Sequence, residues 1–211
     1  MRLWHLSPSD PLSLRLAADG RLGKTDYADD QIWELALGGG DPPALALRTA
    51  FGLRARDMRI FPSFREGESA ITNPAEFASP PVVEQFFVNY LRLRFQPLPA
   101  LEVKAEYWAP ESHAVAGRFT LTNRGDEPRT VRVRLNAVLR PDENPQVMAE
   151  ARIQDVIVLE GSTGNLHPVV FMDGGAEVDE SPFPCLGRDL ALPPGGQAAV
   201  AWGHGGLSSA A

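Results

Sequence analysis

Apolar residues recur at every second position through the middle of the chain, and this pattern restricts the fold more than any other feature. It runs through three segments, 101–107, 115–122 and 131–139, in which polar or charged residues fill most of the intervening positions. A two-residue period is typical of a strand with one buried and one wet face. The Asn-Arg-Gly-Asp-Glu-Pro stretch at 123–128 favours a tight turn. We therefore predict an antiparallel meander with a solvent-facing charged side.

Glycine and proline interrupt the rest of the chain too often for long helices. Each contributes 19 of the 211 residues, and both break regular helices. No segment reads as a crossover helix, so a parallel α/β sheet is disfavoured. We predict further strands over 12–16, 32–37, 45–51, 58–64, 82–95, 153–159 and 169–172, and a hairpin over 190–202. The predicted fold class is all-β, a large antiparallel two-sheet β-sandwich, with a closed barrel as the alternative.

One domain over 1–206 is the predicted organisation, because no linker or internal repeat interrupts the pattern. Ser208 or Ser209 would be a good N-cap before the final alanines. Residues 207–211 are therefore predicted to begin a truncated linker helix. An apolar stretch over 82–90 needs covering on both faces, either inside the domain or by a docking partner.

Composition and charge exclude several function classes. A net charge of −7 argues against nonspecific binding to nucleic acid or to an anionic membrane. The single cysteine, Cys185, excludes an intrachain disulfide and a Cys-rich metal site, and it has no basic neighbour to activate it. We expect no cofactor and no metal. No secretory signal or membrane-spanning segment is visible, so a cytoplasmic location is expected.

Residues 117–131, a strand, a turn and the start of a second strand, resemble a known family. They are similar to the N-terminal β-sandwich ("supersandwich", galactose mutarotase-like) domains of bacterial glycoside hydrolases and phosphorylases. Those domains precede an (α/α)6 barrel in glucoamylase-like and glycogen-debranching-like proteins, and segments 30–35 and 193–204 fit the same family. The resemblance implies a role in carbohydrate metabolism and a catalytic helical barrel in the same polypeptide as partner. The family's catalytic carboxylates lie in that barrel, so the resemblance transfers no catalytic residue.

Acid–base candidates do not form a coherent set in the sequence. Neighbouring carboxylates on a loop usually point apart, whereas an inverting glycosidase needs its pair roughly 6.5–9.5 Å apart across a sugar. The histidines lack zinc-ligand spacing, and the aspartate cluster lacks the EF-hand pattern. We expect solvated loops and structural or surface histidines. The residues weighed are Asp142 with Glu143, Glu66 with Glu68, Asp179 with Glu180, His5, His113, His167, His204, Asp26, Asp29 and Asp30.

Aromatic residues provide the candidate carbohydrate-binding set. Trp33 and Trp202 lie among apolar residues and are predicted to be core. Trp108, at a strand end beside a proline, is the best candidate for an exposed stacking surface, together with Tyr107 or Tyr90.

Three functions follow for testing. The first is a noncatalytic N-terminal accessory domain that packs against a catalytic barrel, with no activity of its own. The second is a freestanding carbohydrate-binding module that recognises an oligo- or polysaccharide. The third is an aldose-epimerase-like enzyme, which would need a His–Glu pair in a concave pocket. A sandwich fold alone is compatible with all three.

Overall fold

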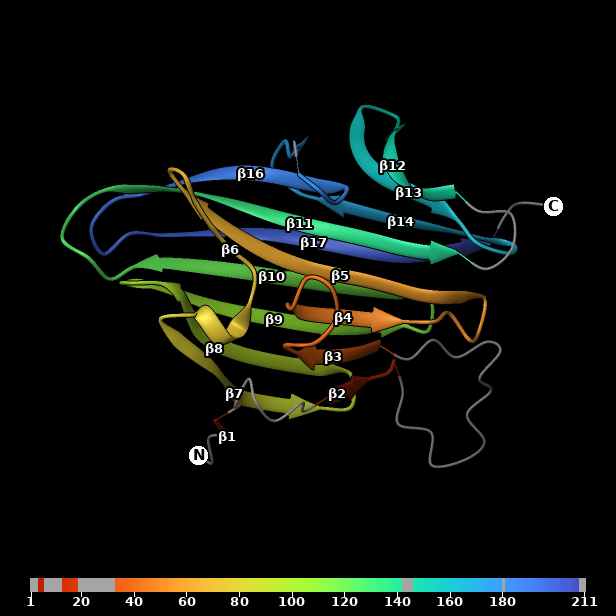
Figure 1. Cartoon of the computed structure of the whole chain (residues 1–211), viewed down its shortest axis with the longest axis horizontal. Helices are drawn as coiled ribbons and strands as arrows, with labels where there is room; N and C mark the ends of the chain where they lie inside the picture. The colour runs from red at the N-terminus through yellow and green to blue at the C-terminus, as the bar shows by residue number, and fades with distance from the viewer. Residues whose placement is uncertain (1–3, 6–12, 19–32, 142–145, 180, 209–211) are drawn as a thin grey trace.

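Two antiparallel sheets stacked face to face make up the protein. The computed structural model describes residues 4–5, 13–18, 33–141, 146–179 and 181–208. Within these ranges every strand pairing is antiparallel, and the one helical element is a 3-10 turn, η1 (Pro74–Glu76). The long strands cross the molecule in two layers (Figure 1). The predicted two-sheet antiparallel β-sandwich is therefore confirmed.

The described residues form nine strands in the first sheet, in the order β1-β7-β8-β9-β10-β17-β14-β13-β12. Two of the three alternating segments predicted as a meander, 101–107 and 115–122, pair at its centre as β9 and β10. The predicted meander is wrong at its third strand, because 131–139 crosses to the second sheet and the distant strand β17 takes the place beside β10. The strands are β1 (Trp4–His5), β7 (Ser79–Phe87), β8 (Tyr90–Leu98), β9 (Leu101–Glu111), β10 (Ala114–Asn123), β12 (Gln146–Ile153), β13 (Val156–Ser162), β14 (Leu166–Met172) and β17 (Gln197–Ser208).

The second sheet follows the order β15-β16-β11-β5-β4-β3-β2, with β6 paired to one end of β5. Its two longest strands, β5 and β11, lie side by side. The strands are β2 (Ser13–Leu16), β3 (Trp33–Leu37), β4 (Leu45–Thr49), β5 (Ala55–Glu66), β6 (Ser69–Ile71), β11 (Arg129–Pro141), β15 (Glu177–Val178) and β16 (Cys185–Leu192).

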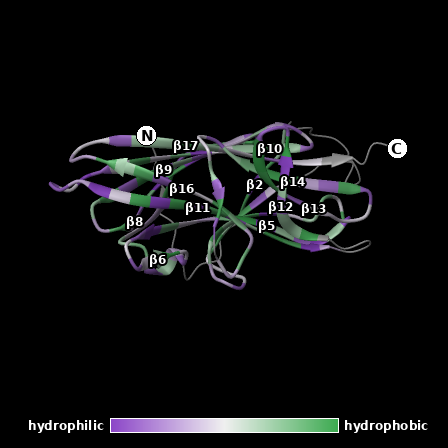
Figure 2. Cartoon of the chain, turned by 90° about the horizontal axis from the view of Figure 1, so that it is seen from above, coloured by the Kyte–Doolittle hydropathy of each residue, from purple (hydrophilic) through white to green (hydrophobic). Residues whose placement is uncertain are grey.

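The core lies between the sheets, and alternate residues of each strand point into it. Figure 2 shows hydrophilic and hydrophobic residues alternating along the strands. Trp33 and Trp202 are buried, as predicted. The rings of Tyr107, Phe119 and Trp202 contact one another with centroids 5.9–6.2 Å apart. Gly117 lies opposite Trp202, and a Cβ there would come within 2.3 Å of the indole. The glycine therefore leaves the space that the tryptophan fills.

Two predicted strands are in fact hairpins. The segment predicted as one strand over 82–95 reverses at Val88 and Asn89, between β7 and β8. The run over 153–159 reverses at Gln154, whose φ of 55° is left-handed. Both turns lack glycine and proline, so neither carried the usual signal of a reversal.

The predicted helix start over 207–211 is corrected at its first two residues. Strand β17 continues through Ser208, because Leu207 and Ser208 pair with His167 and Leu166 of β14. Strand pairing overrides the local capping preference of serine here. Residues 209–211 lie outside the described part of the chain.

A buried arginine holds the loop between β3 and β4 against the outer face of the second sheet. Arg59 donates from Nη1 to the carbonyl of Asp41 and from Nη2 to that of Pro42, both at 2.9 Å. Its guanidinium carbon lies 5.3 Å from the centroid of the Phe61 ring. Burial lowers the pKa of Arg59. This arginine is a structural brace, and its contacts are made within the fold.

Candidate ligand-binding site

The predicted aromatic surface is only partly assembled. Tyr90 of β8 and Trp108 of β9 are cross-strand partners, and both are partly buried. Tyr107 points the opposite way and is 1% exposed, because successive strand residues face opposite sides. The Tyr90 hydroxyl donates to Glu106 Oε1 at 2.8 Å, and burial raises its pKa to about 12. Tyr107 is thus unavailable for stacking on a sugar, whereas Tyr90 and Trp108 share one outer face.

The histidines face different environments. His204 is buried in the core, with Nδ1 3.0 Å from the carbonyl oxygen of Val169, and burial lowers its pKa to about 4. His167 Nδ1 lies 3.4 Å from Glu160 Oε1 at the surface, and His113 is exposed in the turn between β9 and β10. The side chain of His5 lies outside the described residues.

The members of the predicted carboxylate pairs also lie in different environments, or outside the described residues. Glu66 binds Arg129 through both oxygens, and this hydrogen bond lowers the pKa of Glu66, whereas Glu68 is exposed. The partner predicted for Asp179 lies outside the described ranges, as does the Asp142–Glu143 pair. So do Asp26, Asp29 and Asp30. No group of three or more metal-ligating side chains occurs in the part of the chain that the structure describes.

A hollow of about 400 Å³ opens on the outer face of the second sheet. Strand register explains its composition. Arg132 of β11 lies directly between Arg65 of β5 and Asp189 of β16, so all three side chains point to the same face. The residues that line the hollow are Arg65, Gly67, Thr130, Arg132, Asp179 and Asp189.

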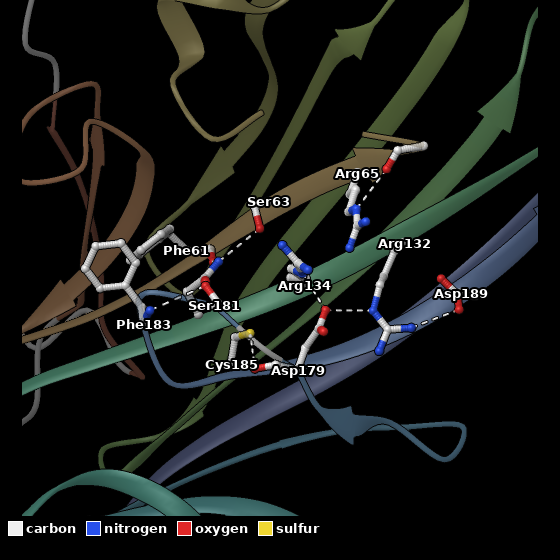
Figure 3. A network of polar contacts seen from close by, with 12 residues as sticks. Phe61, Ser63, Arg65, Arg132, Arg134, Asp179, Ser181, Phe183, Cys185 and Asp189 are labelled. Carbon is white, nitrogen blue, oxygen red and sulfur yellow. Dashed lines mark hydrogen bonds and ion pairs between the residues drawn. The ribbon is translucent and has the colours of Figure 1, made fainter. Parts of the chain in front are cut away.

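One carboxylate organises two of the arginines, as Figure 3 shows. Asp179 Oδ2 accepts from Nε of Arg132 at 2.7 Å and from Nε of Arg134 at 2.5 Å. Arg132 also donates from Nη1 to Asp189 Oδ2 at 2.8 Å. Partial burial opposes ionisation of Asp179, but the hydrogen bonds and charges of the two arginines outweigh it and lower its pKa. Asp179 is therefore a fixed anion and a poor proton donor.

The segment that carries Asp179 is anchored to the sheet. The Asp179 N–H donates to the carbonyl of Cys185 at 3.2 Å, and Phe183 packs edge-on against Phe61 with centroids 5.9 Å apart. Burial raises the pKa of the Cys185 thiol, consistent with the inert thiol that was predicted. At Gly187, a Cβ would lie 2.9 Å from Arg132 Nε and 3.1 Å from Asp179 Oδ2. The absent side chain therefore leaves room for the ion pair.

Sequence reasoning did not identify this hollow, although one signal was present. Arg132 and Arg134 occupy alternate positions on the charged face of the predicted meander. Locating Arg65 and Asp179 beside them requires the pairing of β5 with β11 and the path of the segment after β15. Arg132 and Asp179 follow Arg65 by 67 and 114 positions in the sequence. Local periodicity alone cannot show that residues so far apart lie together.

The Val82–Tyr90 stretch is neither fully buried nor fully open. Val83 is buried, whereas Phe86, Phe87 and Val88 at the hairpin end are 42%, 60% and 48% exposed. The described residues therefore include an uncovered apolar group at this end of the first sheet. They include no helix long and apolar enough to cross a membrane.

Solved structures share this fold, whereas sequence comparison finds no relative. No protein-family model and no curated protein sequence matches the chain. The Slr1438 protein from Synechocystis sp. PCC 6803 superposes with a TM-score of 0.57 and 12% identity, over 99% of this chain and 100% of that one. This likeness shows that the two chains have the same fold.

Two further structures align less closely. A protein described as a kojibiose phosphorylase, from the human microbiome, has a TM-score of 0.49 and 8% identity, over 92% of this chain and 25% of its own. A galactose mutarotase related enzyme from Lactobacillus acidophilus has a TM-score of 0.48 and 8% identity, over 93% and 98%. The chain thus spans a quarter of the first of these proteins and nearly all of the second.

Proposed function

We propose that this chain is a noncatalytic carbohydrate-binding β-sandwich domain that holds a sugar in the hollow between β5, β11 and β16. The observation that carries the proposal is the lining of the hollow. Fixed guanidinium donors and carboxylate acceptors surround a space of about 400 Å³, within the size range of ligand pockets, roughly 300–1,000 Å³. Sugar hydroxyls need both donors and acceptors. The sequence resemblance to domains of glycoside hydrolases and phosphorylases supports carbohydrate as the ligand class.

The side chains that line the hollow are suited to binding a sugar and not to catalysing its reaction. The described residues of its lining include neither histidine nor glutamate, and the most enclosed acid among them, Asp179, is held ionised by two arginines. A general acid needs a raised pKa near the working pH. These described lining residues therefore supply hydrogen bonds and charge, and none of them is a proton donor of the kind that glycoside hydrolysis or epimerisation requires.

We expect the chain to bind oligosaccharides and to turn none over. Asp189→Asn should weaken binding by about fivefold, because an amide replaces a charged acceptor. Titration calorimetry against a panel of neutral and acidic oligosaccharides measures binding, and reducing-sugar and aryl-glycoside assays measure turnover. Asp126→Asn, at an exposed position in the turn between β10 and β11, is the matched control. Turnover that disappears in His113→Gln or His167→Gln would instead support the epimerase function.

Docking against a catalytic helical barrel of the same polypeptide is the second candidate role. The exposed Phe86, Phe87 and Val88 favour it, since interfaces between domains bury apolar groups of this kind. In a polypeptide with such a barrel, Phe87→Ser should uncouple the unfolding of the two domains in calorimetric scans. Val156→Ser, a change of an exposed residue on β13, is the control. Equal effects of the two substitutions would remove the support for docking through this hairpin.

A further inference from the structure

Within the part of the chain that the structure describes, the guanidinium of Arg65 at the hollow has no carboxylate partner. Arg65 and Arg132 lie directly opposite each other on β5 and β11, a placement in which like charges repel. Asp179 pairs with Arg132 and Arg134, and Asp189 pairs with Arg132. No carboxylate among the described residues pairs with Arg65. Among the described residues, Arg65 therefore leaves one guanidinium at the hollow without a balancing carboxylate, in a chain whose net charge is −7.

Arg65 is nevertheless held in a defined position. Its Nε donates to the carbonyl of Gly67, in its own turn, at 2.8 Å. Its guanidinium points toward Arg134 and the hollow (Figure 3). Because Nε is occupied, the two Nη groups remain to contact a ligand. Arg59, six residues earlier on the same face of β5, differs because its Nη groups are bound to loop carbonyls.

We propose that the hollow is an oxyanion site, in which Arg65 with Arg132 binds the carboxylate or phosphate group of an acidic sugar. The planar fork of an arginine matches either group with two parallel hydrogen bonds. An oxyanion between the two guanidinium groups would also remove the repulsion across β5 and β11. Asp189 and Thr130 at the rim can accept from and donate to the sugar's hydroxyls. This inference rests on the proposed function and specifies its ligand.

Titration calorimetry with four probes tests the proposal on the intact chain: inorganic phosphate, glucose, glucuronate and glucose 6-phosphate. We expect both acidic sugars to bind at least tenfold more tightly than glucose, and their affinity to fall as salt rises from 50 to 500 mM, because the contact is ionic. Arg65→Gln should weaken their binding tenfold or more. Arg118→Gln, at an exposed position on β10 of the other sheet, should leave it unchanged.

The outcomes separate the anion site from the sugar-binding function. One outcome is that phosphate binds, that Arg65→Gln abolishes this binding, and that glucose 6-phosphate binds no more tightly than phosphate. This outcome supports the oxyanion site and contradicts carbohydrate as its ligand. Binding of neutral oligosaccharides with no preference for the acidic sugars overturns the oxyanion site and leaves the proposed function standing. Equal affinities of Arg65→Gln and Arg118→Gln also overturn it. Circular dichroism spectra of both variants establish that each retains the strand-rich fold.

Discussion

Gly117→Ala should destabilise the protein by about 3 kcal/mol, the upper part of the usual range for overpacking a core. The added Cβ would lie 2.3 Å from two carbons of the Trp202 indole. That indole is 2% exposed and packs against Tyr107 and Phe119, so it has no free space into which to move. Urea denaturation followed by tryptophan fluorescence measures the loss as a lower midpoint with an unchanged slope.

Gly203→Ala provides a matched control in the neighbouring strand. Its Cβ would also come within 2.3 Å of a ring, that of Phe171. Phe171 is 45% exposed and can swing toward solvent, so the cost should stay below about 1 kcal/mol. If the two substitutions destabilised the protein equally, the packing of Trp202 against Gly117 would not be the determining contact.

Stability should fall by about 2 kcal/mol between pH 7 and pH 5, because of one buried histidine. Burial lowers the folded-state pKa of His204 to about 4, from an ordinary value of 6.5. Below pH 6.5 the unfolded chain therefore binds a proton that the folded chain does not. The stability difference grows as pH falls toward 4, at about 1.4 kcal/mol per pH unit. Urea midpoints across this range provide the measurement.

His204→Leu should flatten that dependence, although the variant loses the hydrogen bond to the Val169 carbonyl. The carboxylates Glu66 and Asp179 have lowered pKa values, so the stability they contribute is lost only at more acid pH. His113→Gln, which retains His204, should keep the wild-type slope. A slope between pH 7 and pH 5 that survives in His204→Leu would show that another group is responsible.

The sequence was most informative where one strand face is buried and the other is wet. Segments 101–107, 115–122 and 131–139 alternate, and each is a strand. The predicted meander of all three is nevertheless wrong, because 131–139 lies in the other sheet and β17 pairs beside 115–122. Hairpin reversals were missed at Val88 and at Gln154, because their turns contain neither glycine nor proline. The strand order was beyond local reasoning, since β17 pairs with β10 and β14 across long sequence separations.

Candidate site residues were predicted less well than the strands. Trp108 and Tyr90 do lie on one face, whereas Tyr107 is core, because neighbours in a strand point to opposite sides. The hollow depends on contacts between β5, β11 and the segment that bears Asp179. Charge alternation in β11 indicated a polar face, but only the sheet register places Arg65 opposite Arg132, where no described carboxylate pairs with it.

The location of bound sugar tests the central claim most directly. In a titration of the labelled protein with an acidic oligosaccharide, NMR spectra of the arginine Nε–Hε and tryptophan indole groups report on each surface separately. We expect the Nε–Hε signals of Arg65, Arg132 and Arg134, assigned with single variants, to shift saturably. The chemical shift of the Trp108 indole signal should stay unchanged. Shifts confined to Trp108, with the three arginine signals unchanged, would contradict the central claim and place the sugar on the opposite sheet.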